Sequence, residues 1–153
     1  MTVAIKDQPE LRVGTVRHIG PYRNIGRAFE RLGSVVAAAG HARPQGSQMI
    51  ALYHDDPRTT AADHLRSDAA MTFPDGAEVT AGLIERHIPA GRYASALHVG
   101  PYEELGEAWA RFRQAVTDAG YREIAGVSYE VYLNDPTRTP QTELRTELFI
   151  RVS

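Results

Sequence analysis

The sequence contains no cysteine, which excludes disulfides, thiolate metal ligands and a cysteine nucleophile. It has little net charge, because 17 Lys and Arg stand against 19 Asp and Glu. A basic nucleic-acid footprint needs an excess of Lys and Arg, so no direct contact with nucleic acid is expected. No apolar run approaches the roughly 20 residues of a membrane span, and the first ten residues lack a signal-peptide core. These absences favour a cytoplasmic protein that makes no membrane contact.

What the sequence does contain is an internal repeat. The order of motifs is the same in both halves of the 153 residues, about 80 positions apart, and such self-similarity indicates a tandem duplication. The repeats cover about residues 11–73 and 90–152, within a single domain spanning 1–153. The matching pairs are His18–Tyr22 with His98–Tyr102, Tyr53–Pro57 with Tyr132–Pro136, and Leu65–Asp68 with Leu144–Glu147.

Each repeat is predicted to form a β-α-β-β unit. Gly-Pro-Tyr is expected to open the helix, with Gly as N-cap and Pro at the first helical position. Apolar residues recur at helical spacing after it, and Gly40 and Gly120 are expected to end the helices in the left-handed conformation. The strands are predicted at residues 11–19, 48–54 and 64–73 of the first repeat and 91–99, 128–133 and 143–152 of the second, with another short strand at 79–86.

The fold class is therefore α+β, with two repeats related by a pseudo-two-fold axis. A cleft between such halves is the natural place for a ligand. Alternation along residues 128–133 gives an apolar side with Tyr129 and Val131, which we assign to the helices. Glu130 and Tyr132 are then expected on the side away from the helices.

At this level of detail the residues resemble a known family. The paired His-x-Gly-Pro-Tyr motifs, Tyr129–Pro136 and Thr146–Ile150 are similar to the GyrI-like small-molecule-binding family. Its domain is also the effector-binding part of AraC-type and MerR-type multidrug regulators. The resemblance implies a duplicated β-α-β-β fold with a central cleft for bulky, often cationic and aromatic molecules. About ten residues precede the first predicted strand, so a standalone module with no DNA-binding domain is expected.

Glu130 is the position to which the resemblance assigns the charge that answers a cationic ligand. A carboxylate held among aromatic rings attracts cations, and each ring adds about 0.5–2 kcal/mol of cation–π attraction. The alternative is a solvent-exposed or Arg-paired glutamate. The further candidate ligand residues are Tyr132, Glu147, Trp109, Tyr102, Tyr93, Tyr22, Phe149 and Asp68.

Several of these candidates have a structural alternative. Trp109 continues an apolar helix stripe, so core packing is its leading interpretation. The structural alternative for Glu147 is a surface charge paired with Arg145 or Arg151. The structural alternative for Asp68 is an exposed acid. His18 and His98 recur beside the Gly-Pro turns, where a structural hydrogen bond at a strand end is favoured over metal binding. No metal and no cofactor are expected.

Three functions remain open from the sequence. The favoured one is a non-catalytic module that sequesters or senses a bulky cationic compound. The second is a hydrolase of reactive, cyclopropane-type electrophiles, with Glu130 as general base. The third, which rests on family analogy, is contact with another protein such as gyrase or a separate regulator.

Overall fold

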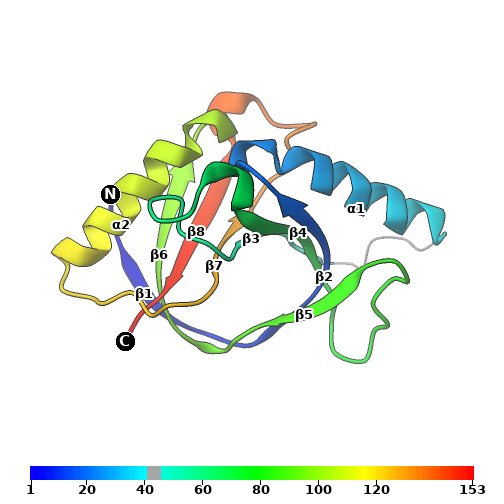
Figure 1. The fold of residues 1–153 in the computed structure, drawn as a ribbon, viewed down its shortest axis with the longest axis horizontal. Coiled ribbons are helices and arrows are strands. Elements are labelled where there is room, and N and C mark those ends of the chain that lie inside the picture. The colour runs from blue at the N-terminus through cyan, green and yellow to red at the C-terminus, as the bar shows by residue number, and fades with distance from the viewer. Residues whose placement is uncertain (41–45) are drawn as a thin grey trace. The chain divides into compact units, whose positions relative to one another are not determined.

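The computed structural model describes residues 1–40 and 46–153, which divide into two compact units. Unit 1 combines the N-terminal segment Met1–Pro9 with Ala90–Ser153, and unit 2 is Glu10–Pro89. Both units contain a helix and antiparallel strands (Figure 1), so the predicted α+β class is confirmed. The cleft expected between the repeats stays a prediction.

The two units have the same order of elements. In the described part of unit 2, the antiparallel strands run β3 (Met49–Tyr53), β4 (Arg66–Thr72), β2 (Leu11–Ile19) and β5 (Ile84–Ile88), with helix α1 (Gly26–Ala38). In unit 1 they run β7 (Ser128–Tyr132), β8 (Arg145–Arg151), β6 (Gly91–Val99) and β1 (Ala4–Gln8), with helix α2 (Leu105–Asp118).

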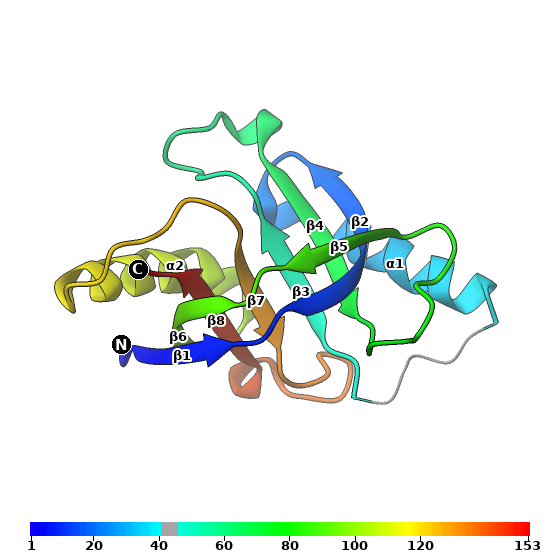
Figure 2. The same cartoon turned by 90° about the horizontal axis from the view of Figure 1, so that it is seen from below.

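The outer strands β1 and β5 depart from the predicted repeat boundaries. Strand β5 forms at Ile84–Ile88, later than the predicted 79–86, and pairs with β2. Strand β1 was not predicted, and it pairs with β6 through Ala4 opposite Ser95 (Figure 2). The strand that precedes each repeat in the chain therefore belongs to the other unit.

Gly-Pro-Tyr does not start the long helix as expected. Short 3₁₀ helices, Tyr22–Asn24 and Tyr102–Glu104, come first, and the prolines are their N-caps. Gly20 and Gly100 have φ values of 127° and 142°, in a region that favours glycine. The predicted structural role of the histidines is confirmed, because the Nε2 atoms of His18 and His98 lie 3.1 and 3.3 Å from the carbonyl oxygens of the prolines three residues later.

The helix ends agree with the prediction. Gly40 and Gly120 have φ values of 70° and 87° directly after the last helical turn. The amide of Tyr121 donates to the carbonyl of Val116 at 3.2 Å, which closes the end of α2 in the manner of a Schellman motif. No helix among the described residues is both long and apolar enough to cross a membrane.

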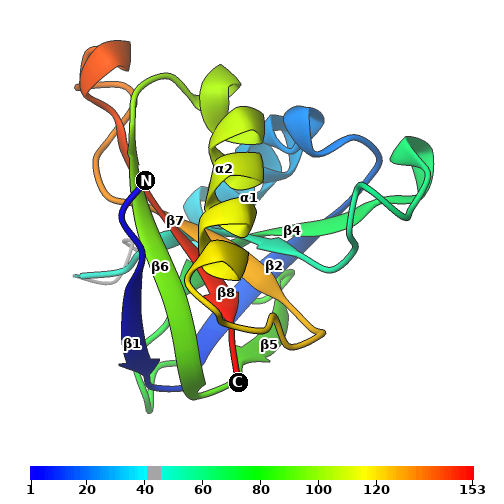
Figure 3. The same cartoon turned by 90° about the vertical axis from the view of Figure 1, so that its left-hand side faces the viewer.

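Helix α2 covers one face of the unit 1 sheet (Figure 3). Its buried face packs against alternate residues of β6 and β8, and close packing of this kind excludes water. Trp109, Tyr102 and Tyr132 are partly buried against the same core. The buried members of this core are Ala94, Ala96, Leu105, Ala108, Phe112, Val116, Leu148, Ile150 and Val152.

This packing corrects the predicted orientation of β7. Leu148 faces α2 and stands directly opposite Glu130, so both side chains lie on the helix side of the sheet. Glu130 and Tyr132 therefore face α2, and Tyr129 and Val131 face away from it. Every residue from Ser128 to Val131 is buried, and a strand that is buried on both sides gives no reliable alternation signal.

Candidate functional site

Glu130 is a fully buried carboxylate on the middle of β7. The indole Nε1 of Trp109, which α2 carries above it, donates a hydrogen bond to Glu130 Oε1 at 3.1 Å. Trp109 is thus both a core residue, as its helix stripe predicted, and a direct partner of the acid. A buried carboxylate is costly to desolvate, and a hydrogen bond to the charge offsets part of that cost.

Two tyrosines complete what we call the Glu130 site, which consists of Glu130, Trp109, Tyr102 and Tyr132. The rings of Tyr102 and Tyr132 lie 5.2 Å apart between centroids, and both are partly exposed. Burial, and then the nearby charges of Glu130 and Asp135, raise the pKa of Tyr102 above its ordinary value of 10.0. The Glu130 carboxylate therefore influences the Tyr102 hydroxyl electrostatically, at the rim formed by these two rings.

Unit 2 provides an internal comparison for this arrangement. Ala51 stands where Glu130 stands, two residues before the tyrosine of the Asp-Pro motif, and Phe29 replaces Trp109 on the helix stripe. The tyrosine pair is kept, with the rings of Tyr22 and Tyr53 4.6 Å apart. The acid and the indole have thus both been replaced by apolar residues in unit 2, while the tyrosines remain.

Tyr22 is held by the backbone. Its hydroxyl donates to the carbonyl of Asp55 at 2.6 Å and receives a hydrogen bond from the Asp55 amide at 3.1 Å. We expect Tyr22→Phe to lower the free energy of unfolding by about 1 kcal/mol, because these backbone groups lose a partner. Urea denaturation followed by circular dichroism measures this loss, and a variant as stable as the wild type would contradict the structural role.

On the other face of the unit 1 sheet, three aromatic side chains form a buried cluster. Tyr129 stacks on Phe149 with ring centroids 4.7 Å apart, and Tyr93 meets both rings edge-on at 5.6 and 6.4 Å. Burial raises the pKa of Tyr93 and of Tyr129. Tyr93 and Phe149 were candidate ligand residues. Tyr129 was not, because it was assigned to the helix side.

Glu147 lies on the same face and has different partners from those expected. Lys6 of β1 forms an ion pair with it, and the hydroxyl of Ser95 donates to it at 2.5 Å. The predicted alternative named Arg145 or Arg151, because β1 was not foreseen. The alternation of Val3, Ile5 and the polar residues between them is the signal that could have revealed this strand.

Asp68 is buried, so the expectation of an exposed acid is wrong. Two arginines and a histidine surround it. Its Oδ1 accepts from Arg17 Nε at 2.8 Å, and its Oδ2 lies 2.5 Å from His54 Nε2 and 3.2 Å from Arg86 Nε. This closed cluster ties β4 to β2, to the end of β3 and to β5, which is the arrangement of a structural ion network.

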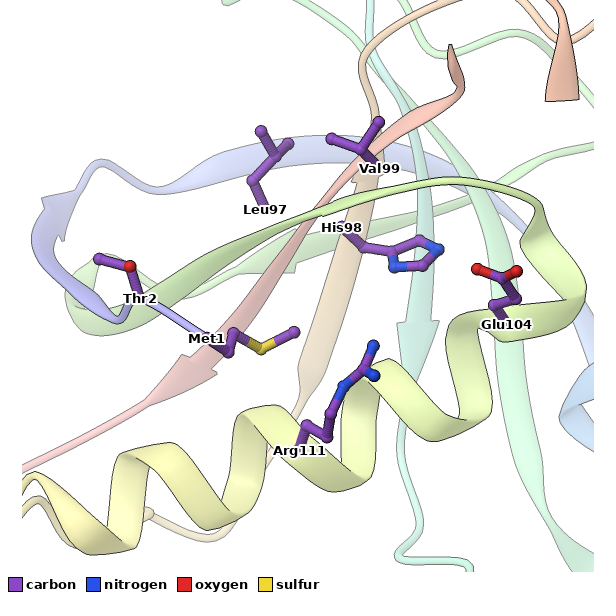
Figure 4. Close-up of a pocket in the computed structure, with 7 residues that line it drawn as sticks. All are labelled: Met1, Thr2, Leu97, His98, Val99, Glu104 and Arg111. Atoms are coloured by element: carbon purple, nitrogen blue, oxygen red, sulfur yellow. The ribbon is translucent and has the colours of Figure 1, made fainter. Parts of the chain in front are cut away.

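A pocket of about 580 Å³ also lies in unit 1, between β6 and the start of α2. Figure 4 shows Arg111 extending from α2 toward the strand that carries His98. None of the predicted ligand residues lines this pocket. Its lining residues are Met1, Thr2, Leu97, His98, Val99, Glu104 and Arg111. Within residues 1–40 and 46–153, no three His, Cys, Asp or Glu side chains gather as a metal site.

Aromatic rings around one carboxylate are the combination of apolar surface and a few polar groups that small-molecule sites use. Comparison with known proteins agrees with this class. The model of the GyrI-like small molecule binding domain matches residues 1–153, so the chain belongs to that family. The resemblance indicated by the sequence motifs is therefore confirmed.

Named relatives and solved structures extend the comparison. A DNA gyrase inhibitor of Serratia proteamaculans is 37% identical over 147 residues, covering 88% of this chain and 88% of that protein. The crystal structure of the EcmrR C-terminal domain has a TM-score of 0.82 at 24% identity, covering 99% and 97% of the two chains. The structure of SAV2435 bound to tetraphenylphosphonium has a TM-score of 0.72 at 12% identity, covering 100% and 94%. The two structural likenesses concern the fold alone.

Proposed function

We propose that the domain binds a bulky organic cation with aromatic groups, and that Glu130 supplies the opposite charge. The observation that carries this proposal is the complete burial of the Glu130 carboxylate beneath Trp109, Tyr102 and Tyr132. Within the family, binding of small molecules is the shared property. The cationic nature of the ligand is our inference from the charge and the rings.

The energetics favour a cationic ligand. Removing a carboxylate from water costs several kcal/mol, and the hydrogen bond from the Trp109 indole offsets part of that cost. A cation brought against the carboxylate gains Coulomb energy in a medium of low dielectric constant, and each neighbouring ring adds cation–π attraction. The tetraphenylphosphonium bound to SAV2435 is a ligand of this kind, with a charge shielded by aromatic rings.

The rim of the Glu130 site suits such a ligand. Tyr102, Tyr132 and Trp109 are each partly exposed, so each ring has surface that a ligand can contact. The guanidinium of Arg113 already lies 5.7 Å from the centre of the Trp109 ring. A cation from this chain is thus already in contact with the indole, and we expect a bound ligand to extend the same type of contact toward Glu130.

The single tryptophan allows a direct test, because Trp109 is the only one in the sequence and belongs to the site. We expect tetraphenylphosphonium to change its fluorescence and Glu130→Gln to weaken binding about ten- to hundredfold. That range corresponds to the loss of one charge-assisted interaction. Gln keeps the shape and an acceptor for the indole, so the variant isolates the charge.

Two controls sharpen the experiment. Glu107→Gln removes an equal charge from the exposed side of α2 and is expected to leave the affinity unchanged. Triphenylphosphine oxide, a neutral aromatic compound, is expected to bind wild type and Glu130→Gln equally. If tetraphenylphosphonium binds Glu130→Gln as tightly as the wild type, Glu130 is not the counter-charge. Loss with Glu147→Gln alone would move the site to the other face.

The relatives named DNA gyrase inhibitor support a second candidate, modulation of gyrase. At 37% identity over most of both chains, the Serratia proteamaculans protein is similar enough to justify the test. Purified bacterial gyrase is expected to supercoil DNA more slowly in the presence of this chain. An unchanged supercoiling rate at a large molar excess of the chain would remove this candidate.

A further inference from the structure

The two units share an acid on the sheet face opposite the helix, and each acid meets a cation from the outer strand. In unit 2 the acid is Asp68 and the cation is Arg86 of β5. In unit 1 the acid is Glu147 and the cation is Lys6 of β1. The registers correspond, because Arg86 stands opposite Val13 of β2 and Lys6 stands opposite Tyr93 of β6.

The two acids differ in how completely they are neutralised. Asp68 meets two further basic side chains, the guanidinium of Arg17 and the imidazole of His54. Leu97 and Leu133 stand at the corresponding positions of unit 1. Among the described residues, Lys6 is the only cationic side chain paired with Glu147. Unit 1 therefore keeps the acid of this arrangement while it lacks two of the three basic partners.

The surroundings of Glu147 are open and apolar. Leu97 and Leu133 are 40% and 44% exposed, and the Glu147 side chain is 19% exposed, whereas Asp68 is fully buried. Lys6 and Ser95 both bind Oε2 of Glu147, and Oε1 makes no hydrogen bond within residues 1–40 and 46–153. One carboxylate oxygen is thus left for a partner that approaches along an apolar rim.

An aromatic ring completes the surroundings. The ammonium of Lys6 lies 5.8 Å from the centre of the Phe149 ring, which is itself stacked on Tyr129. A carboxylate beside an aromatic face is a favourable environment for an organic cation. In this structure the side chain of Lys6 occupies that environment, and this side chain is 42% exposed and able to swing into solvent.

We propose that Glu147, Ser95, Phe149, Leu97 and Leu133 form a second cation site, which we call the Glu147 site, and that Lys6 occupies it as a tethered ligand. An aromatic amidinium or guanidinium compound displaces Lys6 from this site. The site is independent of Glu130, which lies on the opposite face of the sheet.

Unit 2 indicates why the ligand class is an amidinium or guanidinium. There the guanidinium of Arg17 binds the corresponding acid with Nε 2.8 Å from Oδ1. A planar amidinium presents two parallel donors, so it binds both oxygens of one carboxylate, while the ammonium of Lys6 contacts Oε2 alone. The leucine rim and the Phe149 ring favour an aromatic group on the same ligand.

Benzamidine is the probe for this proposal, with isothermal titration calorimetry as the measurement. We expect Lys6→Met to bind benzamidine at least about tenfold more tightly than the wild type, because a tethered competitor has been removed. The double variant Lys6→Met/Glu147→Gln is expected to lose this binding. The proposal is overturned if Lys6→Met gains no affinity, or if the double variant keeps it.

Two further measurements keep the outcomes separate. Glu107→Gln, on the exposed side of α2, added to Lys6→Met is expected to leave benzamidine affinity unchanged. Glu147 lies on the opposite face of the sheet from Glu130, so failure of the Glu130 site does not decide this experiment. In the wild type, which needs no variant to fold, saturating benzamidine is expected to shift the backbone amide resonances of Ser95 and Glu147 but not the indole resonance of Trp109. Absence of the Ser95 and Glu147 shifts at saturation would also overturn the proposal.

Discussion

Replacing Asp68 with asparagine is expected to lower the free energy of unfolding by about 3 kcal/mol, because removing one partner of a buried ion network leaves the others without compensation. Arg17, His54 and Arg86 all bind this carboxylate. Urea denaturation followed by circular dichroism gives the difference. Asp75→Asn, at an exposed turn of the same unit, is the matched control, with an expected loss of less than about 1 kcal/mol.

The same carboxylate predicts a dependence on pH. Burial alone raises the pKa of Asp68, but the hydrogen bonds from His54 and Arg17 outweigh it and hold the pKa below its ordinary value of 3.8. A group whose pKa is lower in the folded state stabilises the fold above its unfolded pKa. This contribution is therefore present at neutral pH and is lost as the pH falls below about 4. If wild type and Asp68→Asn lose stability in parallel between pH 6 and pH 3, Asp68 does not contribute in this way.

Trp109→Phe is expected to lower the free energy of unfolding by about 2 kcal/mol, since the buried carboxylate of Glu130 loses the indole hydrogen bond. The substitution keeps an aromatic ring on the helix stripe, as Phe29 does in unit 2. Thermal denaturation and urea denaturation followed by circular dichroism report the change without relying on tryptophan fluorescence.

A double-mutant cycle then tests whether the loss comes from the acid. Trp109→Phe/Glu130→Ala reproduces the residue pair Phe29 and Ala51, which unit 2 tolerates with Ala51 fully buried. We expect the double variant to cost about 1.5 kcal/mol less than the sum of the single variants, as for directly coupled residues. Additive losses would mean that the indole and the carboxylate stabilise the fold independently.

Much of the fold could be predicted because each motif occurs in both repeats, so the two copies support the same assignment. The strands at residues 11–19 and 91–99 were placed correctly, and so were both glycine helix ends. Strand β1 escaped prediction because only Val3 and Ile5 mark its apolar face, and its pairing partner β6 begins more than 80 residues later. Pairing at such separation depends on tertiary structure, which local sequence does not encode.

The candidate site was predicted in part. Glu130, Tyr132, Tyr102 and Trp109 were all named, and the structure brings them together. The predicted sheet face of Glu130 and Tyr132 was wrong, because hydrophobicity was used to orient a strand whose two sides are both buried. The sheet register resolves this, since Glu130 stands opposite a core leucine of β8. Composition cannot supply that information when the polar residue is itself buried.

The exchange of outer strands has a consequence for how the chain folds during synthesis. Residues 10–89 form one continuous segment that contains all of unit 2, so this unit can fold while later residues are still on the ribosome. Residues 1–9 are translated before unit 2, yet their pairing partner is translated only after residue 90. Until then Lys6 and its neighbours remain without the strand that pairs with them. A substitution that weakens β1 would therefore destabilise the unit that is translated last.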